Sequence, residues 1–288
     1  MIKFIYATTE YRISAKDIAA ELKLPSQEIG EGTAIEWDTP DDHLIIQNPR
    51  GLEAALEAFR GVPRINRPRL TSLFSECCAG FEINGYTDAF LRTADIFDES
   101  FMLNKEDYEW AKVLGYKVFI GGWGWMPSWQ ERFNPFDTRQ DKLFFCGHTD
   151  DWWGGSLKKR REAIDICEKY GKLLRIPTGN RNHEMHADVL ADCKAVICPQ
   201  GHGGYHSGRE YQAAMAGTLI VAYEDKKHPS WAFDDSSSVR LSDPAELEDF
   251  IANQRWNDPS MRERIASARD VVEQFKPPYV WRNITRQL

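Results

Sequence analysis

Residues 200–222 read QGHGGYHSGREYQAAMAGTLIVA, and this stretch decides the expected fold. An apolar strand is expected just before it at 194–198, and a second one at 219–222. Between the two strands come four glycines within eight residues and a helix of small residues that begins at Arg209. A strand, a glycine-rich turn, a helix and another strand form the repeating unit of a doubly wound parallel sheet.

The turn also has the features of an anion site. Backbone N–H groups at a helix N-terminus can bind an anion, and the helix dipole favours negative charge there. Glu210, in the first turn of the expected helix, is placed to accept hydrogen bonds from sugar hydroxyls. The stretch therefore predicts a site for a phosphorylated, sugar-bearing ligand, although glycines in such a turn can also serve only to let the chain reverse.

The composition is that of a globular protein, with 42% hydrophobic and 28% charged residues among 288. The first apolar run is too short for a membrane span and no signal-peptide pattern follows it, which predicts a cytoplasmic protein. The six cysteines are scattered without a CxxC pair, so reduced core thiols are expected and no cysteine-bound metal. The net charge of −8 disfavours general nucleic-acid binding.

Strand and helix patterns alternate in two consecutive series, separated by an irregular connection rich in Gly, Pro and Trp. This predicts an α/β fold with two Rossmann-like parallel-sheet domains facing a cleft, over 1–125 and 142–275, joined by 126–141. Strands are expected at 2–7, 43–47, 69–74, 100–103, 117–120, 142–146, 172–176, 194–198 and 219–222, and helices at 15–22, 51–59, 87–93, 105–114, 156–170, 183–191, 209–216, 244–253 and 260–275.

Ligands of open parallel sheets bind at the carboxyl ends of the strands. The loops that follow expected strands include the polar or glycine-rich segments 8–12, 75–80, 147–156, 178–183 and 200–208. This agreement favours a binding site in the cleft.

The second half resembles the donor-sugar domain of GT-B glycosyltransferases of the soluble "group 1" type. FFCGHTDDWWGGSLKKRREAI (144–164) is similar to the family's first donor-domain strand, glycine turn and basic helix start. DCKAVICPQGHGGYHSGREYQAAMAGTLIVAY (192–223) is similar to the strand, loop and helix that hold the nucleotide sugar. SDPAELEDFI (242–251) and SMRERIASARDVVEQF (260–275) resemble the closing helices, and WMPSWQERFNPFD (125–137) lies where the family has its interdomain connection.

The resemblance implies GT-B architecture and a hexosyl- or pentosyltransferase. Its co-substrate would be a nucleoside-diphosphate sugar, with a UDP-sugar as the first expectation, and no cofactor or metal would be required. It also implies that the tail 276–288 returns to the N-terminal domain, which would bind the acceptor. Glu210 matches the glutamate for the ribose hydroxyls, and Gly203 and Gly204 match the diphosphate loop. The donor-binding residues so expected are Gly147, Lys158, Arg160, Asn180, Arg181, Gly203, Gly204, Tyr205, His206, Ser207, Arg209 and Glu210.

Three residues are candidates for catalysis. An inverting transferase needs a general base in the acceptor domain, and Glu10 and Glu76 follow the first and third expected strands there. Each can equally be a surface carboxylate. His202 stands where retaining members of the family often carry the first glutamate of Glu-x7-Glu, so a retaining mechanism is weakened, although histidine can still hydrogen-bond a sugar hydroxyl.

The first half offers candidate acceptor-binding residues. Arginines hold phosphates and aromatic rings stack on bases or sugars, which favours a hydroxymethylated base flipped out of double-stranded DNA as the acceptor. Bacteriophage enzymes that glycosylate such bases are similar in being small, soluble and of GT-B fold. The residues are the arginines Arg60, Arg64, Arg67 and Arg69, together with Trp123 and Trp125.

Other functions stay open. A small-molecule or cell-envelope glycan is the alternative acceptor, and a non-catalytic nucleotide-sugar-binding protein is the alternative to an enzyme. Zinc at His183 and His186, or at His202 and His206, is a weaker alternative because no cysteine or acid completes either set. A dehydrogenase is weaker still, because ATTEYR after the first strand lacks the dinucleotide glycine fingerprint.

Overall fold

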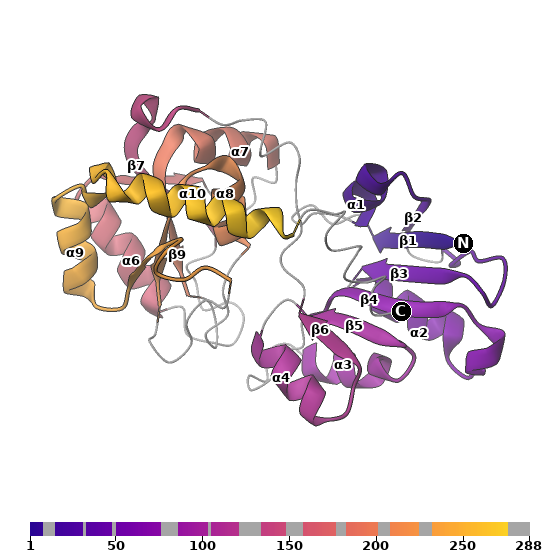
Figure 1. Cartoon of the computed structure of the whole chain (residues 1–288). Helices are drawn as coiled ribbons and strands as arrows, with labels where there is room; N and C mark the ends of the chain where they lie inside the picture. Colours follow the sequence, from indigo (N-terminus) through magenta and orange to yellow (C-terminus); the bar gives the residue numbers. More distant parts are fainter. Residues whose placement is uncertain are drawn as a thin grey trace. The chain divides into compact units, whose positions relative to one another are not determined.

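The structure, a computed structural model, divides into two compact units, one built on Met1–Gly124 and one on Trp125–Gln274 (Figure 1). Each unit holds a parallel sheet of its own. The residues that the structure describes are 1–7, 15–30, 33–47, 50–75, 86–102, 105–120, 134–147, 158–176, 183–200, 208–224 and 232–275.

The first unit is a six-stranded sheet in the order β2-β1-β3-β4-β5-β6, with every pair parallel. Strands of such a sheet are covered on both faces, and all five residues of β3 are buried accordingly. The elements are β1 (Ile2–Ala7), α1 (Ala15–Leu22), β2 (Ser26–Ile29), β3 (His43–Gln47), α2 (Arg50–Phe59), β4 (Arg69–Ser75), α3 (Tyr86–Ala94), β5 (Glu99–Met102), α4 (Lys105–Val113) and β6 (Val118–Ile120).

The core of this unit follows the two-residue period of its strands. Leu44 and Ile46 of β3 share one face and pack with Phe59 of α2 in a single apolar cluster. Farther along the sheet, Phe90 of α3 packs with Met102 of β5 in a second cluster. These helices therefore cover one face of the sheet, while α1 contacts β1 and β2 at the other end.

The second unit is a five-stranded parallel sheet in the order β11-β10-β9-β7-β8, with helices on both sides (Figure 1). Leu143 and Phe145 of β7 pack with Ile164 of α6 and Phe250 of α9, while α7 and α8 contact β9. The elements are β7 (Gln140–Cys146), α6 (Lys158–Lys169), β8 (Leu173–Ile176), α7 (His183–Asp192), β9 (Cys193–Pro199), α8 (Arg209–Ala216), β10 (Leu219–Tyr223), β11 (Val239–Leu241), α9 (Pro244–Ala252) and α10 (Ser260–Glu273).

The amino edge of this second sheet is held by the buried Arg139. Its Nη1 donates to Thr218 Oγ1 at 2.8 Å, and its Nη2 donates to the carbonyl of Ala216, the last residue of α8, at 2.9 Å. Gly217 then ends α8 with a φ of +62°, a left-handed conformation that glycine adopts without steric cost. Arg139 thus satisfies a carbonyl that the end of α8 leaves open. It carried no sequence signal because these two partners lie almost eighty residues away.

The expected fold class is confirmed: the protein is α/β with two parallel sheets. Two strands, β2 and β11, were not expected. Ser26–Ile29 buries one residue of four, and Val239–Leu241 has three residues, so neither carries an apolar pattern, and both lie at sheet edges. The tail 276–288 lies outside the described residues, so its return to the first domain stays a prediction, as does the cleft.

Each sheet has one point where the strand order reverses. It falls between β1 and β3 in the first unit and between β7 and β9 in the second, because successive crossovers there go to opposite sides. In open α/β sheets, the ligand site lies outside the carboxyl ends of the strands at such a point. The sheet topology therefore predicts a ligand site at the carboxyl ends of β7 and β9.

Candidate functional site

The candidate site is the carboxyl edge of the second sheet around β7 and β9. Cys146 ends β7 and is followed by Gly147, while Gln200 follows β9. The helices after these strands, α6 and α8, begin at Lys158 and Arg209. In a parallel sheet, both helix N-termini therefore return from this same edge, with the positive ends of their dipoles toward it.

Arg209, the first residue of α8, is tied to the end of β7. Its Nε donates a hydrogen bond to the carbonyl of Cys146. Its guanidinium carbon lies 5.1 Å from the centroid of the Phe145 ring, which is within the range of a cation–π contact. The side chain is half-buried, and Phe145 beneath it is fully buried. The predicted donor residues Arg209 and Gly147 are thereby brought together.

Arg160, in the first turn of α6, lies close enough to Arg209 for the two charges to interact. Burial lowers the pKa of Arg160, and the positive charge of Arg209 lowers it further. Burial also lowers the pKa of Arg209. A guanidinium stays charged at neutral pH, so these shifts reflect the free-energy cost of holding two positive charges here. A bound anion would offset that cost.

Glu210 is buried, with 1% of its surface exposed, in the first turn of α8. Burial lowers the pKa of Arg209 and raises that of the Cys198 thiol, and the negative charge of Glu210 acts on both groups, which places the carboxylate near both. An acid in the first turn is also favoured by the helix dipole. The predicted role of Glu210 toward ribose hydroxyls stays a prediction.

Lys158 and its neighbour Lys159 differ in their surroundings. Lys158 is exposed. Lys159, which the sequence analysis did not single out, donates to the carbonyl of Ser242 at 2.9 Å and lies 4.7 Å from the centroid of the Tyr223 ring. The Tyr223 hydroxyl in turn donates to Glu162 at 2.5 Å. Lys159 thus joins α6 to the ends of β10 and β11, through partners too distant in sequence to signal the contact.

Cys146 and His186 also meet at this edge, with the thiol sulfur 3.8 Å from both ring nitrogens. Burial raises the pKa of the Cys146 thiol, although the charge of Arg209 opposes the shift. The thiol is therefore protonated at neutral pH and is a poor nucleophile. Within the described ranges, no three His, Cys, Asp or Glu side chains are grouped so that they could hold a metal ion.

The arginines expected to bind the acceptor lie in the first unit, where strands β4 and β5 of its sheet begin. Arg69 begins β4 and donates to Glu99 at 2.8 Å, and Arg67 donates to Asp98 at 3.2 Å. Arg64 also pairs with Asp98, whereas Arg60 is exposed. This is the amino edge of the sheet, opposite to the edge where parallel sheets bind ligands. The placement favours a structural role for this cluster.

Many of the expected site residues lie outside the described residues. Nothing in the structure therefore tests the catalytic candidates or most of the glycine-loop residues. They are Glu10, Glu76, Trp123, Trp125, Asn180, Arg181, His202, Gly203, Gly204, Tyr205, His206 and Ser207.

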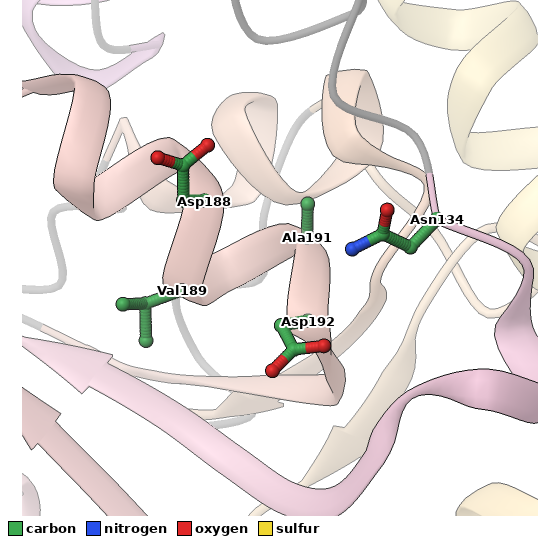
Figure 2. Close-up of a pocket in the computed structure, with 5 residues that line it drawn as sticks. All are labelled: Asn134, Asp188, Val189, Ala191 and Asp192. Carbon is green, nitrogen blue, oxygen red and sulfur yellow. The ribbon is translucent and has the colours of Figure 1, made fainter.

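A pocket of about 400 Å³ lies elsewhere on the second unit, along α7 (Figure 2). Asp192 ends α7 just before β9 begins, and Asn134 precedes β7, so the pocket belongs to the amino-edge side of the sheet. It is distinct from the candidate site at the carboxyl edge. Its lining residues are Asn134, Asp188, Val189, Ala191 and Asp192.

Among the helices that the structure describes, none combines the length and the apolar character that crossing a membrane requires.

The fold was compared with known proteins. No family model matches the chain, and no curated protein matches it significantly. The Anabaena protein HepE, solved with UDP and glucose, is similar with a TM-score of 0.62 and 11% identity, over 99% of this chain and 98% of that one. A putative UDP-N-acetylglucosamine 2-epimerase from Listeria monocytogenes is similar with a TM-score of 0.54 and 11% identity, over 95% and 94%.

The pneumococcal O-GlcNAc transferase GtfA, solved with UDP and GlcNAc, is similar with a TM-score of 0.55 and 12% identity. The match covers 86% of this chain and 56% of GtfA, so the chain spans just over half the length of that transferase. At these identities the likeness shows the fold alone. Together with the two parallel sheets, it shows that this chain has the GT-B fold.

Proposed function

We propose that the protein is a glycosyltransferase that binds a UDP-sugar at the carboxyl edge of its second sheet. The observation that carries the proposal is the pair Arg160 and Arg209, two half-buried guanidinium groups beside the N-terminus of α8 at the β7/β9 reversal. Similar structures hold UDP together with a sugar, which supports a uridine nucleotide over other diphosphates.

The arrangement suits the departure of a diphosphate. In sugar transfer, the bond between the anomeric carbon and the diphosphate oxygen breaks, and the acceptor oxygen forms a new bond to that carbon while its proton passes to a base. Negative charge grows on the departing diphosphate, where the two arginines and the dipole of α8 would stabilise it. Glu10, Glu76 and His202 stay the proposed candidates for proton transfer or sugar contact.

The proposed class of acceptor depends on the arginines of the first unit. A DNA acceptor drew its support from Arg60, Arg64, Arg67 and Arg69, and three of these form ion pairs with Asp98 or Glu99. A glycan or small-molecule hydroxyl is therefore proposed as an acceptor on an equal footing with DNA. Hydroxymethylated DNA is tested separately, as an alternative acceptor.

Two other functions of a nucleotide-sugar site need to be separated from transfer. The likeness to a putative 2-epimerase favours a reaction that changes the donor sugar without any acceptor. A binding protein would hold the nucleotide sugar without consuming it.

The test is an assay of the purified protein with UDP- and GDP-sugars, followed by UDP or GDP release and by the identity of the remaining sugar. Release that depends on a glycan, a small hydroxylated molecule or hydroxymethylated DNA would support transfer and name the acceptor class. A changed sugar without release would indicate epimerisation, and binding without either would indicate a binding protein.

The site itself is tested by Glu210→Gln, which keeps the size of the side chain and removes its charge. We expect UDP affinity to fall about tenfold, since a hydrogen bond to a charged group contributes about 1.5 kcal/mol or more. Glu168→Gln, on the exposed side of α6, is the matched control and should leave affinity unchanged. Wild-type protein that bound no nucleoside diphosphate would contradict the proposal.

A further inference from the structure

We propose that Gly147 is a positioning residue that fixes the Arg209 guanidinium for the diphosphate of the donor. The inference rests on the proposed function, because it names which part of the donor Arg209 meets and what holds Arg209 there. Gly147 acts here by having no side chain, which leaves space for Arg209, and not by contacting the ligand itself.

The space beside Gly147 is filled by Arg209. A Cβ built on Gly147 would lie 2.2 Å from Nη2 of Arg209 and 3.1 Å from its Cζ. The same Cβ would lie 3.3 Å from the edge of the Phe145 ring. Two heavy atoms cannot approach to 2.2 Å without a bond, so any side chain at this position would displace the guanidinium.

Three other glycines among the described residues lack the crowding found at Gly147. Gly61, Gly115 and Gly171 have φ values of +77°, +88° and +61°, and an added Cβ at any of them would meet nothing within 4 Å. These three need glycine only for the backbone conformation. Gly147, at φ +155°, needs it for the backbone and also for the space that a neighbouring side chain occupies.

Three contacts then fix Arg209 in one orientation. Its guanidinium lies over the Phe145 ring, its Nε donates to the carbonyl of Cys146, and its Nη2 occupies the volume beside Gly147. A long, flexible side chain held in this way loses less conformational entropy when a ligand arrives, which raises affinity.

The chemistry of the held group points to the diphosphate. A guanidinium presents planar pairs of N–H donors that match phosphate oxygens, and the N-terminus of α8 adds the favourable end of a helix dipole. Uracil and ribose offer no comparable negative charge. Displacing Arg209 should therefore weaken binding of uridine diphosphate and leave binding of uridine largely unchanged.

The experiment compares the affinities of UDP and uridine by calorimetry for wild type, Gly147→Ala, Arg209→Ala and the double variant. We expect Gly147→Ala and Arg209→Ala each to weaken UDP binding about tenfold, with uridine affinity within about twofold of wild type. The double variant should bind UDP as Arg209→Ala does, because the alanine at 147 has no guanidinium left to displace. Gly171→Ala is the matched control for backbone strain and should bind UDP normally.

Losses that add in the double variant, or unchanged UDP affinity in Gly147→Ala, would overturn the inference while the proposed function stands. Wild-type protein that prefers UDP no more than uridine would overturn both. Should Gly147→Ala fail to fold, the double variant carries the test. A folded double variant supports displacement by the guanidinium, and an unfolded one overturns it, because the strain would then lie in the backbone.

Discussion

The two arginine clusters of this protein differ in what surrounds them. At the amino edge of the first sheet, Arg67 and Arg69 lie within 3.2 Å of the carboxylates Asp98 and Glu99. At the carboxyl edge of the second sheet, burial lowers the pKa of Arg160, and the neighbouring positive charge of Arg209 lowers it further. The first cluster is compensated within the protein and stabilises it. The second brings two like charges close together, as an anion site does.

The largest test of this contrast is the removal of Glu99. Its carboxylate is 2% exposed and meets Thr71 and Arg69, each at 2.8 Å, and Lys117 at 3.1 Å. Because Glu99→Ala leaves the buried Thr71 hydroxyl and the half-buried Arg69 without their acceptor, we expect the free energy of unfolding in urea to fall by about 3 kcal/mol. Glu109→Ala, in the exposed pair with Lys105, is the control and should cost less than about 0.5 kcal/mol. Equal effects would remove the contrast.

The pH dependence of stability probes the same network through His43, whose Nε2 lies 2.7 Å from Thr71 Oγ1. Burial and the charge of Arg69 lower its pKa to about 4. Between pH 6.5 and 4 the unfolded chain therefore binds a proton that the folded chain does not, so stability falls as pH falls, by up to about 3 kcal/mol.

Hydrogen bonds from Thr71, Arg69 and Lys117 lower the pKa of Glu99 despite its burial, so its contribution is lost only at still lower pH. Urea unfolding of wild type and His43→Gln at pH 7.5 and pH 5 separates the two groups. The variant should lose much less stability between these pH values than wild type does. Parallel losses in both proteins would assign the effect to other groups.

The second cluster responds differently to the loss of an arginine. Arg160→Met should weaken UDP binding about tenfold, the effect of one charge-assisted hydrogen bond, and this loss of affinity should exceed any loss of stability of the ligand-free protein. Arg161→Met, on the exposed side of the same turn, is the matched control. Calorimetry and thermal unfolding measure the two quantities, and a large loss of stability without loss of affinity would make this cluster structural too.

The smallest effect is expected from Arg60→Ala. Arg60 is exposed at the amino edge of the first sheet. The acceptor KM should therefore change by less than about twofold, and the free energy of unfolding by less than about 0.5 kcal/mol. A tenfold rise in the acceptor KM would restore the arginine cluster as an acceptor site.

The sequence predicted most of the fold because its strands are buried on both faces and its turns contain glycine. The helix α8 has the predicted bounds, 209–216, since Gly208 precedes it and Gly217 ends it. β2 and β11 were missed because short edge strands carry little apolar signal. Arg64, Arg67 and Arg69 precede or begin β4, so a parallel sheet places them at its amino edge, away from the edge where ligands bind.

The candidate site was predictable only in part. Arg209 and Gly147 were both expected near the donor, but their mutual crowding depends on side chains that meet across sixty residues of chain. Lys159 and Arg139 gave no signal, because each binds backbone carbonyls, which every residue possesses.

The fixed amino edge of the second sheet has an evolutionary consequence. Arg139 holds the end of α8, and Lys194 and Trp256 both donate to Asp141 at the start of β7, where the Lys194 hydrogen bond lowers the pKa of Asp141 to about 2. These bonds lie a full strand length from the loops at the carboxyl edge. Insertions and substitutions in those loops can accumulate without loosening the scaffold, so under the proposed function descendants of such a chain would change the ligand they bind while they continue to fold.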